Sequence, residues 1–295
     1  MASLPPIPET GRSPRSVRAE PVEAPSSSGP DTGKKEGPST GSGRTESGIL
    51  FETLLRLGDD SLILGQRLGE WCGHAPSVEV DLSLANMGLD LIGQATHFLN
   101  AAGIAEGQGR DGDALAFRRD VLDFRNCWLV EQPNGDFAQT MIRQLLFSTW
   151  QEMLFQHLTR SSDETTAAIA AKAVKEVHYH AELSAEWAIR LGDGTEESRR
   201  RMAAGLDWHW RFVPELFEMD AIATESAARG IGADVNLFRA DYDARIRAVL
   251  SEATLEAPKD QRPILGGRRG HHGEHLGHIL AVMQYLPRTY PDATW

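Results

Sequence analysis

The hydrophobic positions of residues 81–99 recur at mixed steps of three and four residues, which predicts a largely buried helix. The stretch reads DLSLANMGLDLIGQATHFL, and its large apolar residues are Leu82, Leu84, Met87, Leu89, Leu91, Ile92, Phe98 and Leu99. Two alanines, Ala85 and Ala95, fill the same side. A helix of this kind belongs to the core, so we expect the other elements to be organised around it.

The same spacing predicts helices on both sides of this stretch. Before it, residues 48–71 form a long helix that the turn at residues 73–76 ends. After it we expect helices over about 114–128, 136–158, 161–192, from 195 onward, over 237–250 and over 272–286. Ser161 and Glu164 form a capping box for the third of these six helices, Pro214 should kink or break the fourth, and Pro287 stops the last. No segment alternates with period two over a useful length, so the fold class is all-α, a bundle with additional flanking helices.

Residues 1–47 differ in composition from the rest of the chain. They are rich in Pro, Gly, Ser and Thr and contain no aromatic residue. Such a segment cannot bury enough apolar surface to offset the entropy of ordering it, so we expect a disordered extension. A functional tail, a dispensable extension and a misassigned start site all remain open. Residues 48–295 are expected to form the helical domain.

The chain carries a formal net charge of -12, and the imbalance falls entirely within residues 48–295. An acidic surface disfavours nucleic acid and anionic membranes as partners, because phosphate binding needs clustered Lys and Arg. Cys72 and Cys127 lie far apart in sequence and beside tryptophans, as small packed hydrophobic residues do. The chain has neither a secretory signal pattern nor a long apolar run, so we expect a cytoplasmic protein.

The middle of the central stretch has the shape of a metal-binding motif. Residues 90–95 read DLIGQA, which matches the D-E-L-x-H-A segment of ferritin-like di-iron helices except at the two ligands. Leu91 stands in the place of the glutamate and Gln94 in the place of the histidine. Leucine cannot coordinate a metal, and glutamine is a poor substitute for imidazole. We therefore expect a ferritin-like bundle whose metal site has degenerated.

Residues 175–180, KEVHYH, are the second place to look for such a ligand pair. In the Glu-x-x-His register Tyr179 takes the position of the imidazole, whereas His180 lies four residues after Glu176 and so on the same helix face. We expect a buried hydrogen-bonded pair between Glu176 and His180 rather than a metal site. If metal were bound, Glu176 and His180 would be its ligands.

Three further groups of polar residues are less specific. A set of four histidines could share one helix face, but zinc needs more converging ligands, so bonds to neighbouring helices or to a partner are expected. A glycine- and arginine-rich loop at residues 266–270 could hold an anion at a helix N-terminus. On the first helix, several residues lie where a ferritin-like fold needs a lone carboxylate, or they are surface charges and a capping group. The residues concerned are His271, His272, His275 and His278, and on the first helix Asp59, Asp60, Glu70 and Trp71.

Five strings together resemble one protein family. They are LRLGD at 55–59, QRLGEWCGHAP at 66–76, LANMGLDLIGQA at 84–95, VEQPNG at 130–135 and HGEHLG at 272–277. They resemble the C subunits of bacterial phenylacetyl-CoA 1,2-epoxidases, multicomponent monooxygenases of aerobic phenylacetate catabolism. The likeness runs from about residue 48 to residue 295, and only the N-terminal extension has no counterpart.

The resemblance implies a structural, non-catalytic subunit that pairs with a homologous A subunit and stabilises it. The A subunit is implied to hold the di-iron centre and the CoA thioester. The complex is also implied to have a small B subunit, and a reductase that supplies electrons from NADPH through flavin and iron–sulfur groups. No cofactor is expected on this chain itself.

Two other functions remain open. The chain could be a di-iron oxygenase in its own right, which a complete second Glu-x-x-His motif would favour, and none is present. It could also be a helical protein that binds an acyl-CoA or another anion through Arg268 and Arg269.

Overall fold

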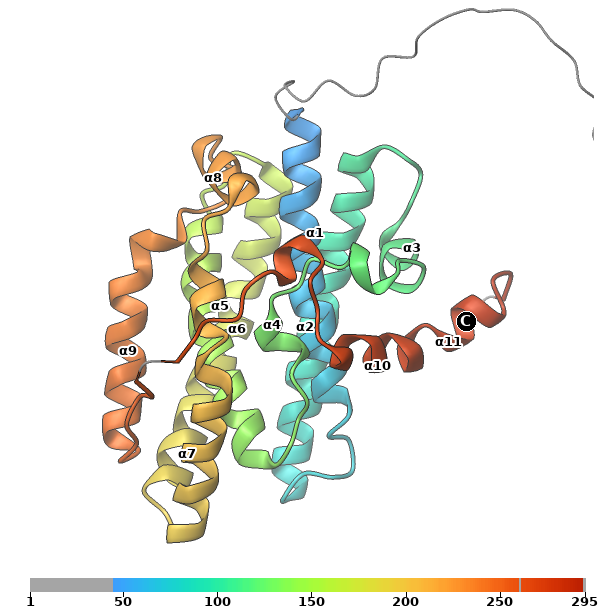
Figure 1. Ribbon diagram of the computed structural model, residues 1–295. Coiled ribbons are helices and arrows are strands. Elements are labelled where there is room, and N and C mark those ends of the chain that lie inside the picture. Colours follow the sequence, from blue (N-terminus) through green and yellow to red (C-terminus); the bar gives the residue numbers. More distant parts are fainter. Residues whose placement is uncertain (1–44, 260, 294–295) are drawn as a thin grey trace, which may run out of the picture. The chain divides into compact units, whose positions relative to one another are not determined.

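Four long helices form the centre of the computed structural model, which describes residues 45–259 and 261–293 (Figure 1). They are α1 (Glu46–Gly69), α2 (Val78–Glu106), α5 (Phe137–Leu158) and α6 (Glu164–Gly192). Helices α1 and α2 pack along each other, as do α5 and α6, and α2 also contacts α6. Within these residues there is no strand, so the prediction of an all-α bundle with flanking helices is confirmed.

Shorter helices cover this bundle. Helix α9 packs against both α5 and α6, and α8 packs against α1. Helices α10 and α11 extend sideways from the bundle in Figure 1. The short elements are α3 (Gly112–Phe117), η1 (Val121–Asp123), α4 (Trp128–Glu131), α7 (Glu196–Trp210), η2 (Val213–Phe217), α8 (Ala221–Ala228), η3 (Val235–Phe238), α9 (Arg239–Glu252), η4 (Gly267–Arg269), α10 (Glu274–Met283) and α11 (Tyr285–Thr289).

Small residues let α1 and α2 approach closely. A Cβ atom on Gly58 would lie 2.6 Å from Cδ2 of Leu99, and one on Gly65 would lie 3.0 Å from Cδ1 of Ile92. A larger residue at Gly58 would therefore need the Leu99 side chain to move aside. The two glycines let α1 and α2 pack closely along each other.

The expected burial of the central helix is only partly right. Leu84, Leu91 and Phe98 are buried, but the exposed fractions of Leu82 and Leu89 are 61% and 69%. Both were placed on the buried side because the apolar pattern covers most of the helix circumference, and spacing alone does not distinguish an inner from an outer leucine. Cys72 was also misplaced, since it is exposed, whereas Cys127 is buried as expected.

Several predicted helix ends differ from the structure. The N-cap of α6 is Asp163, whose carboxylate accepts from Thr166 N, so the predicted Ser161–Glu164 box is wrong. The predicted helix over residues 114–128 is divided into α3, η1 and α4, and α8 was not predicted. Pro214 lies in η2, after α7 ends at Trp210, as expected of a helix breaker.

The last predicted helix, over 272–286, is divided into two helices in the structure. Helix α10 ends at Met283, and α11 continues through Pro287, the predicted stop, to Thr289. At the other end, α1 begins at Glu46 with Thr45 as its N-cap, two residues before the expected boundary at Gly48. The rest of the predicted extension, residues 1–44, lies outside the described residues, so its prediction of disorder is not tested. No helix of the described chain is long and apolar enough to cross a bilayer.

Candidate functional site

A polar cluster inside the bundle takes one side chain from each of the four long helices. Nε2 of Gln94 on α2 donates to Oε2 of Glu176 on α6 over 3.1 Å. Nε2 of Gln151 on α5 donates to Oε1 of Gln94 over 3.2 Å and lies 3.5 Å from Oγ of Ser61 on α1. Ser61, Gln94 and Gln151 are all buried. The four helices of the bundle therefore meet in a chain of hydrogen bonds.

The two residues of α2 that replace the metal ligands in the degenerate motif point into the bundle. Leu91 has no exposed surface and Gln94 only 2%, so the two residues expected to replace the ligands both face the interior. On α6 the equivalent inward pair, spaced i and i+3, is Val177 and His180, both fully buried. The second motif is therefore Val177-x-x-His180, with an aliphatic residue again in the place of the glutamate.

This register corrects two predictions. Tyr179, assigned to the position of the imidazole, is 47% exposed and lies outside the bundle interior. The predicted hydrogen bond between Glu176 and His180 is wrong, because Glu176 accepts from Gln94 and Nε2 of His180 lies 3.0 Å from Oδ2 of Asp90. The four-residue spacing places Glu176 and His180 on one face of α6, but the hydrogen-bond partner of each lies on α2.

The interior donor set does not fit a di-iron centre, which needs several converging carboxylates and imidazoles. At this depth the four helices present two amides, a hydroxyl, two aliphatic side chains, one imidazole and one carboxylate. Among these side chains, only Glu176 and His180 have the chemistry of a metal ligand. No group of three or more His, Cys, Asp or Glu side chains in the described part of the chain is arranged to hold a metal ion.

One end of the cluster is open. A groove of about 200 Å³ between α2 and α6 is lined by Gln94 and Glu176, together with Leu89, His97 and Lys172. Nζ of Lys172 lies 3.2 Å from Nε2 of His97 at this groove. Water can therefore reach Glu176 from outside, whereas Gln151 is buried in the bundle interior.

Asp59 and Asp60 are not surface charges, because both side chains are buried and paired with arginines. Asp59 is paired with Arg119 and also accepts from Arg125 N. Oδ2 of Asp60 lies 2.7 Å from Nη2 of Arg268, and its Oδ1 accepts from Cys127 N over 2.8 Å. Burial raises the pKa of the Asp60 carboxyl, which the ion pair with Arg268 opposes. These bonds fix the loop before α4 to the middle of α1.

The remaining two candidates, Glu70 and Trp71, directly follow the C-terminal end of α1 at Gly69. Glu70, whose side chain is 45% exposed, pairs with Arg67, and Nε1 of Trp71 donates to Oγ1 of Thr140 over 3.0 Å. Neither has a bond to the polar cluster. The residue that α1 does supply to the cluster, Ser61, was missed, because a single serine between apolar residues gives no signal in the sequence.

The four histidines do not share a helix face, because α10 begins only at Glu274, after His271 and His272. The His272 side chain is fully buried, with Nδ1 2.8 Å from Oε2 of Glu131 and Nε2 3.0 Å from the Phe124 carbonyl oxygen. It therefore joins α10 to the α4 region, as expected for a histidine that bonds to a neighbouring element. The rings of His275 and His278 lie 6.3 Å apart on α10.

The loop at residues 266–270 does hold an anion, but the anion is a side chain of the protein. The amides of Gly266 and Gly267 donate to Oε1 of Glu215 over 2.8 and 2.7 Å, and Trp128 N donates to its Oε2 over 2.6 Å. Burial raises the pKa of Glu215, and these three N–H groups oppose the rise. Arg268 is already paired with Asp60, which leaves little capacity for an external phosphate.

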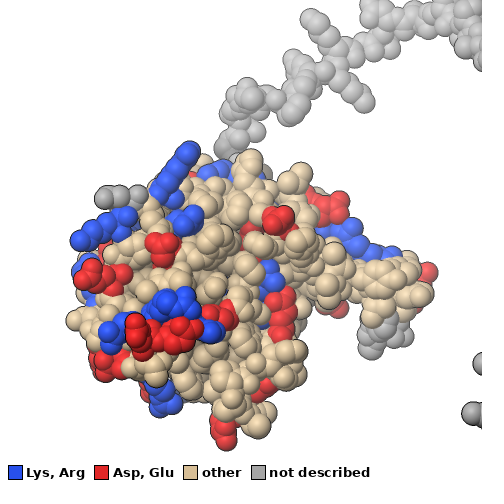
Figure 2. All heavy atoms as spheres, turned by 60° about the horizontal axis from the view of Figure 1, so that its bottom comes forward, with Lys and Arg blue, Asp and Glu red and all other residues tan. Residues whose placement is uncertain are grey.

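Surface charge gives no sign of a polyanion site on the face drawn in Figure 2, where acidic and basic side chains lie next to one another. On α7, the exposed side chains of Glu197, Arg200 and Arg201 also combine both charges, with two ion pairs of 2.8 and 2.7 Å. Mixed charges of this kind largely cancel beyond the Debye length.

Comparison with known proteins gives the family. Residues 38–295 match the family described as phenylacetic acid catabolic protein. The chain is 50% identical over 241 residues to the C subunit of 1,2-phenylacetyl-CoA epoxidase from Escherichia coli (strain K12), an alignment that covers 82% of this chain and 97% of that protein. This agrees with the resemblance carried by the five sequence strings. The chain therefore belongs to the phenylacetic acid catabolic protein family.

Proposed function

We propose that this chain is the non-catalytic subunit of a phenylacetyl-CoA epoxidase complex, and that it pairs with and stabilises a homologous di-iron A subunit. The observation that carries the proposal is the hydrogen-bonded cluster of Ser61, Gln94, Gln151 and Glu176, which occupies the interior positions where a ferritin-like oxygenase holds its metal ligands. The relative from Escherichia coli is named as one subunit of an epoxidase, which supports a role within a larger complex.

In this proposal the chemistry belongs to other subunits. The A subunit would hold the di-iron centre and the CoA thioester, and a reductase would supply electrons from NADPH through flavin and iron–sulfur groups. A small B subunit would be the remaining member of the complex. This chain would contribute a surface of fixed shape, since hydrogen-bonded amides at the centre of the bundle hold the four helices in one arrangement.

An exposed apolar face on α2 supports pairing with another chain. Val78, Leu82 and Leu89 follow one another at steps of four and seven residues, so they lie on one side of the helix, and their exposed fractions are 72%, 61% and 69%. Exposed apolar residues that gather on one side of a helix are typical of interaction surfaces. We place the A subunit on this face of α2.

The first experiment measures iron and zinc in the purified full chain, expressed with added iron, by elemental mass spectrometry. Well below one atom per chain is expected. A value near two irons per chain would refute the proposal, and the chain would then have to be assayed as an oxygenase that uses Glu176 and His180.

The second experiment tests pairing by co-purification with the A subunit. The double variant Leu82→Asp/Leu89→Asp should lose the A subunit while keeping its own thermal unfolding midpoint, because both side chains are already exposed. Leu237→Asp is the matched control, since Leu237 is 71% exposed but lies in η3. Equal recovery of the A subunit with both variants would place the interface elsewhere.

A further inference from the structure

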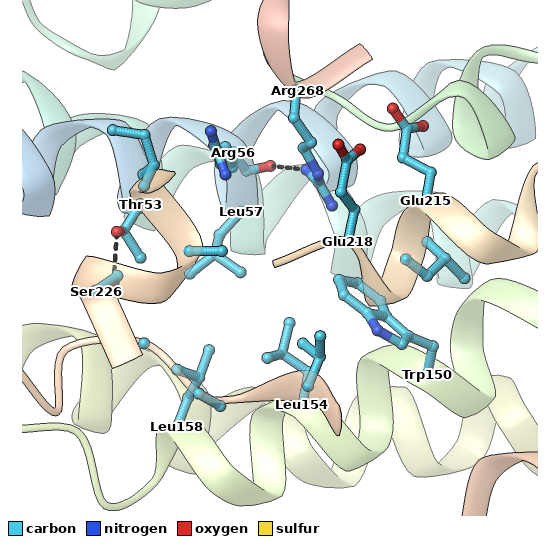
Figure 3. Close-up of a pocket in the computed structure, with 16 residues that line it drawn as sticks. Thr53, Arg56, Leu57, Trp150, Leu154, Leu158, Glu215, Glu218, Ser226 and Arg268 are labelled. Carbon is cyan, nitrogen blue, oxygen red and sulfur yellow. Dashed lines mark hydrogen bonds between the residues drawn. The ribbon is translucent and has the colours of Figure 1, made fainter. Parts of the chain in front are cut away.

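A cavity of about 90 Å³ lies between α1, α5, η2 and α8, beside Trp150, and none of the cluster residues lines it (Figure 3). Both arginines of its wall, Arg56 and Arg268, are paired with carboxylates at 2.7 Å, so the cavity indicates no charged ligand. A second feature away from the cluster is the buried pair of His272 and Glu131, which joins the start of α10 to α4. The proposed function does not use this pair, so its role is independent of that proposal.

Both ring nitrogens of His272 face hydrogen-bond acceptors. Nε2 lies 3.0 Å from the carbonyl oxygen of Phe124, which can only accept, so Nε2 carries a hydrogen. Nδ1 lies 2.8 Å from Oε2 of Glu131. A neutral imidazole has one N–H group, which Nε2 already uses, so the bond between Nδ1 and Oε2 needs a second proton. The pair therefore holds one proton more than a neutral histidine and an ionised carboxylate hold together.

The other contacts of Glu131 favour the imidazole as the holder of this proton. Oε1 of Glu131 accepts from Gly273 N over 2.7 Å, and Oε2 also accepts from Nδ2 of Asn126 over 3.0 Å. N–H donors of this kind stabilise the ionised form of a carboxyl group. The side chains of His272 and Glu131 have no exposed surface, so each charge depends on the other for its compensation.

Two arginines come near the pair through backbone carbonyl oxygens. Nη1 of Arg125 donates over 2.9 Å to the carbonyl oxygen that His272 also contacts, and Nη2 of Arg67 donates over 2.8 Å to the carbonyl oxygen of Glu131. Their positive charges oppose protonation of His272, but both arginines have carboxylate partners of their own, at 2.9 and 3.6 Å. The titratable neighbours of His272 on its own segment are exposed, and they are His271 and Glu274. Direct contact with Glu131 therefore outweighs these charges.

We propose that His272, as an imidazolium, holds the start of α10 on the bundle and releases it when the proton is lost. Glu131 is the last residue of α4, and Gly273, which it also binds, is the N-cap of α10. Loss of the proton leaves one ring nitrogen without a hydrogen opposite an acceptor, and it leaves the Glu131 carboxylate buried without a counter-charge. Because the closed contact binds a proton that the open one releases, a rise in pH favours opening of α10 and α11, which extend sideways in Figure 1.

The first measurement determines the charge of His272. Nitrogen chemical shifts of the histidine rings, recorded on the full isotopically labelled chain at pH 8, report which ring nitrogens carry hydrogen. A histidine in water titrates at about 6.5 and is neutral at this pH. His272 should instead carry hydrogen on both nitrogens, with its signals assigned from their loss in His272→Gln. A single N–H group on this ring, at either nitrogen, would overturn the proposal.

The second measurement follows hydrogen exchange of the α10 backbone amides from Leu276 to Leu280. After correction for the intrinsic exchange rate, opening in the unaltered chain should increase about tenfold between pH 7 and pH 8, because each opening releases one proton. His272→Gln keeps a side-chain N–H donor but cannot be protonated. Its α10 amides should be less protected at pH 7, and their corrected exchange should change less than about twofold up to pH 8.

His275→Gln is the matched control, because it removes a histidine from α10 itself that makes no side-chain hydrogen bond to Glu131. It should keep both the protection and the pH dependence of the unaltered chain. Corrected exchange that does not change with pH in the unaltered chain would overturn the proposal, and this measurement needs no variant. Equal pH dependence in His272→Gln, or equal loss of protection in the two variants, would do the same.

Discussion

Replacement of Gln94 by alanine separates a structural role of the polar cluster from a catalytic one. Gln94 is the central member of the cluster, since it donates to Glu176 and accepts from Gln151. If the cluster only holds the helices together, Gln94→Ala should lower the stability of the chain and leave turnover of the assembled complex nearly unchanged. If the cluster acts in the reaction, turnover should fall as well.

The expected loss of stability follows from the two broken bonds. A hydrogen bond to a charged acceptor contributes about 1.5–3 kcal/mol, but water from the groove can replace Gln94 beside Glu176, which favours the lower value. Gln151 is 2% exposed, so the loss of its main acceptor costs about 1 kcal/mol more. The total of about 2–3 kcal/mol corresponds to a fall of roughly 4–12 °C in unfolding midpoint for a domain of this size.

The assay combines thermal unfolding of the isolated chain with turnover of the complex reconstituted from all its subunits. Thr96→Ala is the matched control, because Thr96 lies on the same helix and its hydroxyl bonds only to the Ile92 carbonyl oxygen at the surface. A hundredfold loss of turnover with the complex intact, equivalent to about 2.7 kcal/mol of transition-state stabilisation, would refute the structural role. An unchanged thermal unfolding midpoint of Gln94→Ala would refute the contribution of the cluster to the stability of the chain.

Two further predictions concern buried titratable side chains away from the cluster. Burial lowers the pKa of His209 from its ordinary 6.5 to about 3, so the unfolded chain binds a proton between these values and the folded chain does not. The free energy of unfolding should therefore fall as the pH drops below 6.5, by about 1.4 kcal/mol per pH unit more than in the His209→Gln variant. Urea unfolding from pH 6.5 to 4.5 measures this difference. Parallel plots of unfolding free energy against pH for the two chains would contradict the prediction. Asp60→Ala leaves Arg268 buried without its carboxylate and should cost about 3–5 kcal/mol in the same unfolding assay. Glu197→Ala, which removes a carboxylate whose side chain is 54% exposed, should leave the unfolding midpoint in place, and an equal effect of the two substitutions would show that burial is not the cause.

The sequence determined the features that depend on neighbours within one helix. The three- and four-residue spacing predicted the long helices, because each helix buries one side and its pattern repeats locally. The degenerate motif was also readable, since Leu91 and Gln94 are three residues apart on α2 and share an inward face. The fold class followed from the lack of any segment with period two.

Tertiary structure alone decided which residues meet. Gln94 bonds to Glu176 and Gln151 because the separation and rotation of three helices bring them together, and nothing local to any one helix records this. For the same reason Leu89 was assigned to the core although it lies outside, and Glu176 was paired with His180 although both bond to α2. The cavity beside Trp150 likewise exists only where α1, α5 and α8 converge. Local spacing fixes the face of a helix on which a side chain lies, but the packing of distant segments fixes what that face contacts.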